Sequence, residues 1–309
     1  MATPKKNKYE DLGLDTKSIS GGFRALNKDG SFNVKKRNVP FLERINIFHS
    51  LVSMSWLHFF SMLALSYFSI NVFFASLYTI IGTEHLTGIH GTTDLEQFVE
   101  AFFFSAQTIT TLGYGQVAPL HLATNIVAAT ESLLGLLLFA LATGLMYGRF
   151  SKPYATIKYS AFALIAPYQE ATGFMFRIVN PKNNQLIEVE ITVTLSLKRL
   201  DSNQRDFHLL ELERNKVAFF PTMWTIVHPI TDKSPIHNFT LTKMIEQDAE
   251  FIVMIKAFDE SFSQTVYSRS SYKAEEIKWG QKFVYITEIE DDGLSVDISR
   301  LNETEPAQC

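Results

Sequence analysis

The sequence predicts an α-helical membrane domain with two transmembrane helices and a shorter re-entrant helix, followed by an all-β cytoplasmic sandwich. Three observations predict this fold. The 309-residue chain has 28 Lys and Arg residues, yet none lies between Arg44 and Arg149. Within that base-free stretch, a short apolar run leads into Thr-Thr-Leu-Gly-Tyr-Gly at 110–115. After residue 153, apolar and polar residues alternate as they do in the strands of a soluble domain.

Two segments of the base-free stretch are long enough to cross a membrane. Trp56–Ile81 has about 26 residues, which span a hydrocarbon core about 30 Å thick. The second segment runs from Leu122 to Gly148 and contains one acid, Glu131. Basic residues flank the outer ends of the pair, so both termini are expected in the cytoplasm. We expect a multi-pass protein of the plasma (inner) membrane, with its pore domain over residues 56–152.

Residues 41–55, before the first span, mix apolar and polar positions. Phe41, Ile45 and Phe48 recur at the spacing of a helix that lies along the inner membrane surface. The alternative is that these residues form the first turns of the first span. Residues 1–40 are expected to be a cytoplasmic segment, which is polar and mobile over residues 1–35.

A third apolar run, from Phe98 to Ile109, lies between the two spans. Its length of about 12 residues is too short to cross the membrane as a helix. Pro119 follows, and irregular backbone at membrane depth survives only where protein or water surrounds it. We therefore expect a re-entrant pore helix over residues 97–110 and an extended filter over residues 111–115.

The filter residues have the pattern expected of a potassium-selective pore. Replacing the water shell of K⁺ by backbone carbonyls is the established mechanism of filters of the Thr-Val-Gly-Tyr-Gly type. Gly113 and Gly115 can take positive φ without a Cβ penalty, which lets successive carbonyls face one axis. Thr111 adds a hydroxyl, whereas the side chains of Leu112 and Tyr114 are expected to point away and hold the filter's width. K⁺ would bind the carbonyls of residues 111–114 as the permeant ion, and no cofactor is needed.

One chain supplies one filter segment, which cannot surround an ion. A cyclic assembly with fourfold symmetry supplies rings of four carbonyls. We therefore expect a C4 homotetramer.

The second half of the chain, residues 153–299, is expected to form the β-sandwich. Residues 187–197 alternate apolar and polar side chains over their whole length. Further strands are expected at 174–179, 223–228, 251–258, 264–268 and 282–288, separated by turn-rich breaks. Residues 300–309 are polar and are expected to form a flexible tail.

Several function classes are not expected. The net charge of −4 argues against a nucleic-acid binder, which needs a basic surface. The eight histidines have no metal-ligand spacing, and no nucleophile elbow or phosphate loop is present. The acidic pair Glu275-Glu276 is interpreted as a solvated face. The protein is therefore not expected to be an enzyme.

The chain resembles the inward-rectifier potassium channel (Kir) family, and its prokaryotic members most. The resemblance rests on Ala-Phe-Phe-Phe-Ser-Ala-Gln-Thr-Ile-Thr-Thr-Leu-Gly-Tyr-Gly at 101–115 and Gly-Arg-Phe-Ser-Lys-Pro at 148–153. It also rests on cytoplasmic motifs that separate Kir channels from other two-span potassium channels: Trp-Thr-Ile-Val-His-Pro-Ile (224–230), Ser-Pro-Ile (234–236), Ser-Arg-Ser-Ser-Tyr (268–272) and Glu-Ile-Lys-Trp-Gly (276–280).

The resemblance implies further features. Residues 41–55 would be the slide helix, and the cytoplasmic domain would be immunoglobulin-like. Tyr147 matches the narrowing at the helix-bundle gate, and 258–268 matches a loop that constricts the cytoplasmic pore. Arg149 and Lys152 match the region that binds anionic lipid headgroups such as phosphoinositides. Both residues would also serve as positive-inside anchors.

The sequence departs from the strong rectifiers of that family. Their acid in the inner helix is Phe139 here, and a second pore-lining acid aligns with Lys256, so weak rectification is expected. Filter support also differs, because Gln107 replaces a Glu behind the filter and Val117 replaces its basic partner. Glu131 either braces the pore helix or is protonated.

One alternative function comes from another class. A membrane-tethered β-sandwich could act as a sensor or interaction module without conduction. Such a protein has no use for Gly113 and Gly115 or for a short re-entrant run.

Overall fold

The computed structural model describes residues 8–9, 24–34, 38, 40, 46–151, 156–182, 184–202, 204–220, 222–291 and 293–307. The chain forms two compact units, residues 37–152 and residues 1–36 with 153–309, and each is described by itself. The start of the expected slide helix at 41–45, and Lys152, lie outside the described residues.

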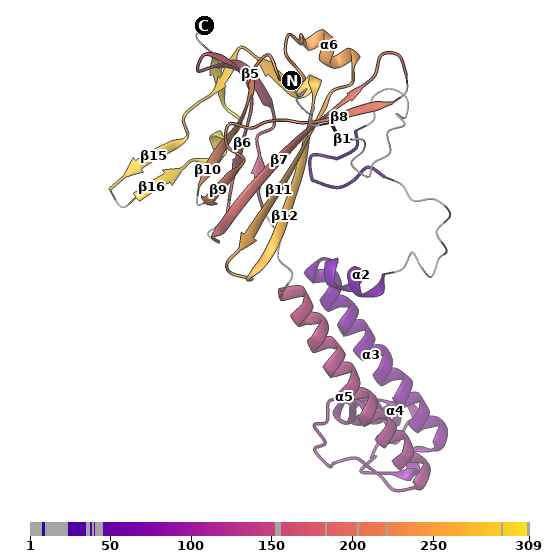
Figure 1. The fold of residues 1–309 in the computed structure, drawn as a ribbon. Coiled ribbons are helices and arrows are strands. Elements are labelled where there is room, and N and C mark those ends of the chain that lie inside the picture. The colour runs from indigo at the N-terminus through magenta and orange to yellow at the C-terminus, as the bar shows by residue number, and fades with distance from the viewer. Residues whose placement is uncertain are drawn as a thin grey trace. The chain divides into compact units, whose positions relative to one another are not determined.

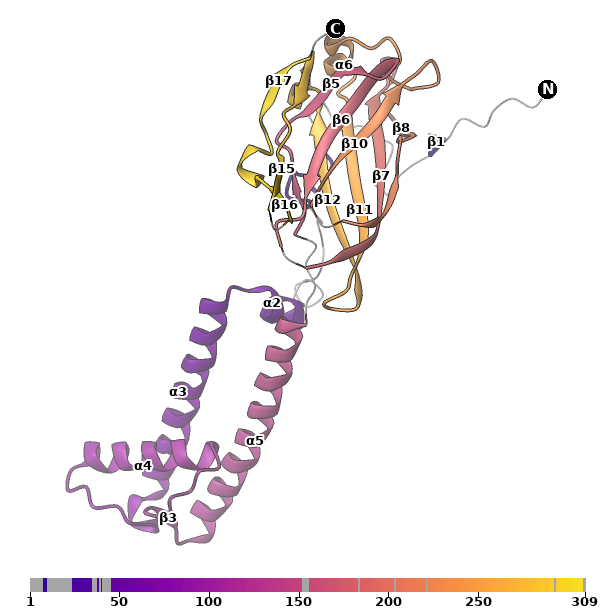
Figure 2. The ribbon, with the colours of Figure 1, turned by 90° about the vertical axis from the view of Figure 1, so that its left-hand side faces the viewer.

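The first unit is helical (Figure 1). The helices are α2 (Ile47–Ser53), α3 (Trp56–Ile81), α4 (Asp94–Ile109) and α5 (Leu122–Phe150). Helices α3 and α5 are long and apolar enough to cross a membrane. Figure 2 shows α4 lying across the end of these helices that is farther from α2.

The ends of these helices follow from local hydrogen bonding. The Ser55 side chain accepts from the backbone N–H of His58 at the start of α3. Gly82, with φ of 115°, caps the C-terminal end of α3. Thr93 and Glu96 form a capping box at the start of α4, so the pore helix begins at 94 and not at 97. After α3 come the 3₁₀ turn η1 (Thr83–His85) and β2 (Leu86–Thr87). Strand β2 pairs with β3 (Ala118–Pro119) and ties the two ends of the re-entrant loop together.

The second unit is a β-sandwich, as expected (Figure 2). One sheet has the order β1-β8-β7-β11-β12, with β9 also paired to β7. Its strands are β1 (Lys8–Tyr9), β7 (Leu186–Lys198), β8 (Arg205–Leu209), β9 (Lys216–Phe219), β11 (Glu250–Asp259) and β12 (Gln264–Lys273). The other sheet has the order β10-β6-β5-β13, with β4 also paired to β6. Its strands are β4 (Lys158–Tyr159), β5 (Ala163–Tyr168), β6 (Ala171–Val179), β10 (Met223–Ile230) and β13 (Ile277–Trp279).

The core of this unit lies between the two sheets. The ring of Phe174 on β6 stacks on Phe251 of β11, with centroids 4.1 Å apart. Alternate residues of β7, which include Val189, Ile191 and Val193, are buried in the same core. A short helix that the sequence did not predict, α6 (Leu241–Glu246), adds Met244 to it.

Two sequence predictions near the C-terminus are wrong. The single strand expected at 282–288 is two strands: β14 (Gln281–Phe283) pairs with β17 (Thr304–Pro306), and β15 (Thr287–Glu290) pairs with β16 (Gly293–Val296). The expected flexible tail is folded over residues 300–307, because the 3₁₀ turn η3 (Ile298–Arg300) precedes a buried Leu301 and then β17.

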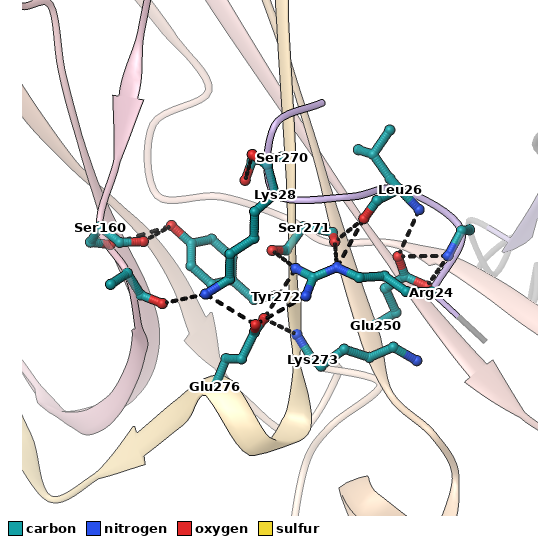
Figure 3. A network of polar contacts seen from close by, with 12 residues as sticks. Arg24, Leu26, Lys28, Ser160, Glu250, Ser270, Ser271, Tyr272, Lys273 and Glu276 are labelled. Carbon is teal, nitrogen blue, oxygen red and sulfur yellow. Dashed lines mark hydrogen bonds and ion pairs between the residues drawn. The ribbon is translucent and has the colours of Figure 1, made fainter. Parts of the chain in front are cut away.

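The prediction of a mobile N-terminal segment is also wrong for residues 24–34, because these residues pack on the sandwich (Figure 3). The backbone N–H groups of Ala25 and Leu26 donate to the buried carboxylate of Glu250 at 3.0–3.1 Å. Arg24 donates to both carboxylate oxygens of Glu276, at 3.0 and 3.1 Å, and Lys28 lies 3.0 Å from the same group.

Glu276 is therefore not part of a solvated acidic face. Burial acts to raise the pKa of Glu276, but donation from Arg24, the Lys273 N–H and Lys28 outweighs it and holds the pKa below its usual value.

Candidate ion pathway

The filter begins where α4 ends. The N–H of Thr111 donates to the carbonyl of Thr108 at 3.0 Å, and the N–H of Leu112 donates to the carbonyl of Gln107 at 2.8 Å. Three alternate residues then have positive φ: Thr111 at 58°, Gly113 at 54° and Gly115 at 83°. Reversing every second residue in this way allows successive carbonyls to face the same side, which a regular strand or helix does not.

In the single chain, the two filter glycines are required by backbone conformation and not by lack of space. A Cβ on Gly113 or Gly115 would meet nothing within 4 Å, but both residues are in the left-handed region that favours glycine. The positive φ of Thr111 was not predicted, since it is unusual for a β-branched residue. Strain of this kind costs about 1–3 kcal/mol and is typical of functional sites.

Glu131 on α5 joins the three helices α3, α4 and α5. The hydroxyl of Tyr78 on α3 donates to Oε2 of Glu131 at 2.7 Å, and Oγ of Ser105 on α4 contacts Oε1. Ser105 Oγ also lies 3.0 Å from Oδ1 of Asn71 on α3. All four side chains have no exposed surface. Glu131 thus has the geometry of a brace for the pore helix.

The other expected filter supports act differently. The contacts of Gln107 with the filter are made by its backbone carbonyl. Val117 packs with the apolar cluster that contains Phe74, Tyr78 and Phe104. A further support was missed: Gly135 on α5 lies so close to Ile109 that a Cβ there would be 2.1 Å from the Ile109 carbonyl oxygen. The sequence has no signal for this contact.

The expected cavity and gate residues lie on α5. Phe139 is 74% exposed and Tyr147 is 73% exposed in the single chain. The expected constriction loop, 258–268, is the tip of the hairpin formed by β11 and β12 and includes the end of β11, the turn and the start of β12. Buried Asp259 shapes its turn by accepting from the N–H of Ser261 at 2.9 Å. Lys256 is exposed on β11, in register with Glu190 and Tyr267.

Arg149, expected to bind lipid, has protein partners. Its guanidinium donates to the carbonyls of Leu51 and Met54 at 2.6 and 2.7 Å, at the C-terminal end of α2. It also lies 4.5 Å from the ring centroids of Trp56 and Phe59. This arrangement fastens α2 to the end of α5.

Comparison with known proteins decides the family. The model for the inward rectifier potassium channel transmembrane domain matches residues 26–153, and the model for the inward rectifier potassium channel C-terminal domain matches residues 157–309. The inward rectifier potassium channel Kirbac3.1 of Paramagnetospirillum magnetotacticum is 31% identical over 91% of this chain and 95% of its own length. The chain belongs to the inward rectifier potassium channel family.

Relatives from animals are more distant. The G protein-activated inward rectifier potassium channel 2 of Rattus norvegicus is 27% identical over 91% of this chain and 71% of its own length. The ATP-sensitive inward rectifier potassium channel 8 of Homo sapiens is 26% identical over 91% of this chain and 73% of its own length. The higher identity to the bacterial protein confirms the predicted likeness to prokaryotic Kir channels. Membership places the chain among ion channels and not among enzymes.

Proposed function

We propose that four copies of this chain form a passive potassium channel whose filter is residues 111–115. The observation that carries this proposal is the alternation of positive φ at Thr111, Gly113 and Gly115 directly after α4. In this proposal K⁺ binds the carbonyls of residues 111–114, and family membership supports potassium as the ion.

The exposed side chains of the single chain support a homotetramer. Tyr114 is 73% exposed and Leu112 is 55% exposed, although both were expected to pack behind the filter. A neighbouring copy is the surface that would cover them. Phe139 would then face the cavity and Tyr147 the gate of the assembled channel.

Regulation by anionic lipids is proposed on the charge pattern alone. Arg149 and Lys152 follow the second span, in a position where basic side chains meet headgroups on the cytoplasmic side. Because the Arg149 guanidinium already binds two carbonyls, Lys152 is the better candidate for direct headgroup contact. The same charge pattern supports cytoplasmic termini. We also propose the plasma (inner) membrane as the location of the channel.

The test is a K⁺ flux assay on proteoliposomes, with Ba²⁺ as blocker. We expect K⁺ uptake that exceeds Na⁺ uptake, that Ba²⁺ inhibits and that Gly113→Asp abolishes. Gly280→Asp is the matched control, because Gly280 also has positive φ and open space but lies in the cytoplasmic unit. A folded protein without flux would favour the tethered sensor module, and equal K⁺ and Na⁺ uptake would indicate a non-selective pore.

A further inference from the structure

The hydrogen bonds around Glu131 indicate whether its carboxyl group is protonated or ionised. The cluster consists of Asn71, Tyr78, Ser105 and Glu131, all buried. Nδ2 of Asn71 donates to the backbone carbonyl of Tyr67 at 2.7 Å. That bond fixes the orientation of the amide, so the Asn71 oxygen, which can only accept, faces Ser105.

Ser105 has two acceptors within reach but one hydrogen to donate. Its hydroxyl oxygen contacts both Oδ1 of Asn71 and Oε1 of Glu131. If Glu131 were ionised, one of these two contacts would lack a proton and would set two buried lone pairs against each other. If Glu131 carries a proton on Oε1, it donates to Ser105, and Ser105 donates to Asn71. Tyr78 then donates to Oε2, and every contact is a hydrogen bond.

The charge balance of the membrane domain points the same way. No Lys or Arg lies between Arg44 and Arg149, so neither span supplies a Lys or Arg to pair with an ionised Glu131. Neighbouring copies would bring the same base-free sequence. Tyr78 is the titratable group that contacts Glu131 among the described residues, and it is neutral when it donates. An unpaired charge buried at membrane depth is strongly unfavourable.

We propose that Glu131 is a neutral carboxylic acid that donates its proton to Ser105 and thereby positions the pore helix behind the filter. The chain of hydrogen bonds runs from Glu131 on α5 through Ser105 on α4 to Asn71 on α3. Ser105 lies in the last two turns of α4, close to Gln107 and Ile109. The carbonyl of Gln107 accepts from N–H groups of the filter, and the carbonyl of Ile109 lies against Gly135. Glu131 is a positioning residue, and this role rests on the proposed filter function.

Infrared spectroscopy of the full-length protein in lipid tests the protonation state without requiring conduction. The difference spectrum between wild type and Glu131→Gln at neutral pH should contain the C=O stretch of a protonated carboxylic acid in the wild type, which shifts when Glu is labelled with ¹³C. Loss of a carboxylate band in its place would overturn the proposal.

The positioning role has its own readout. Glu131→Ala should lose K⁺ selectivity, and Glu131→Gln should restore it, because the amide can donate to Ser105 and accept from Tyr78. Selectivity that survives in Glu131→Ala would overturn the positioning role. Absence of flux in the wild type would refute the proposed function and leave the infrared result intact.

Discussion

Replacing Gly135 by Ala should separate the pore helix from α5. A Cβ at this position would lie 2.1 Å from the carbonyl oxygen of Ile109 and 2.8 Å from the carbonyl carbon. Real Cβ atoms essentially never come within 3.0 Å of a neighbouring atom, so the first distance must grow from 2.1 Å to at least 3.0 Å. The obstacle is backbone and not a flexible side chain, so the helices themselves must shift. Thr111, the first filter residue, is two positions beyond Ile109 and should shift with it.

The expected change in the free energy of unfolding of Gly135→Ala follows from two opposing effects. Ala is about 1 kcal/mol better than Gly in a helix interior. Forcing an extra carbon into a packed contact costs about 1–3 kcal/mol. Gly144→Ala is the matched control on the same helix, since a Cβ there meets nothing within 4 Å in the single chain. We expect Gly144→Ala to be neutral or stabilising and Gly135→Ala to be destabilising by up to about 2 kcal/mol.

The assay measures thermal stability of the purified protein and K⁺ over Na⁺ uptake in proteoliposomes for both variants. Gly135→Ala should lower both quantities, whereas Gly144→Ala should keep wild-type selectivity. If Gly135→Ala matches the wild type in stability and selectivity, the close contact between α5 and the end of the pore helix is refuted.

Three further predictions concern other parts of the chain. Arg149→Lys should speed hydrogen exchange of the α2 amides, because an ammonium group keeps the charge but lacks the planar fork that binds both Leu51 and Met54. Burial lowers the pKa of His228 below its usual 6.5, although its contacts with Glu211 act in the opposite direction. The unfolded chain therefore binds the proton more readily, so β10 should lose protection from hydrogen exchange as the pH falls below about 6.5. Spermine should block the wild type weakly, and Phe139→Asp should make the block steeply voltage-dependent, because it adds a ring of four acids to the proposed cavity.

Each of these predictions has a contradicting result. Unchanged α2 exchange in Arg149→Lys would mean that charge alone matters at this position, as lipid binding requires. A pH dependence of β10 protection that persists in His228→Gln would assign it to another group. Steep spermine block in the wild type would show that the channel rectifies without an acid at Phe139.

The membrane segments were largely predictable from the sequence. The first span, Trp56–Ile81, matches α3 at both ends, and α5 extends the second span from Gly148 to Phe150. The length of the apolar segments and the absence of Lys and Arg determine these boundaries, and both features are visible in the sequence. The start of α4 was missed because the helix was predicted from the apolar run Phe98–Ile109, and the acids of its first turn, Asp94 and Glu96, lie before that run. The Thr93–Glu96 capping box shows that they belong to the helix.

Long-range contacts account for most of what could not be predicted. The positive φ of the filter glycines was predictable because glycine adopts this conformation without a steric penalty. The positive φ of Thr111 was not predictable, because its side chain disfavours that conformation. The partners of Glu131 lie 26 and 53 residues away, and Glu276 meets Arg24 across 252 residues. The periodicity of a sequence does not indicate such distant pairs. The hydrogen bonds of Glu131 and the packing of residues 24–34 on the sandwich could therefore be found only from the structure.

The reversal potential of single channels with K⁺ on one side of a bilayer and Na⁺ on the other tests the central claim most directly. If carbonyls of residues 111–114 replace the hydration shell of K⁺, current should reverse only at a strongly biased voltage that opposes K⁺ flow. The same channels with Gly113→Asp should not conduct. A wild-type reversal near zero voltage would mean that Na⁺ and K⁺ pass equally well, and it would contradict selection of K⁺ by the carbonyls of this filter.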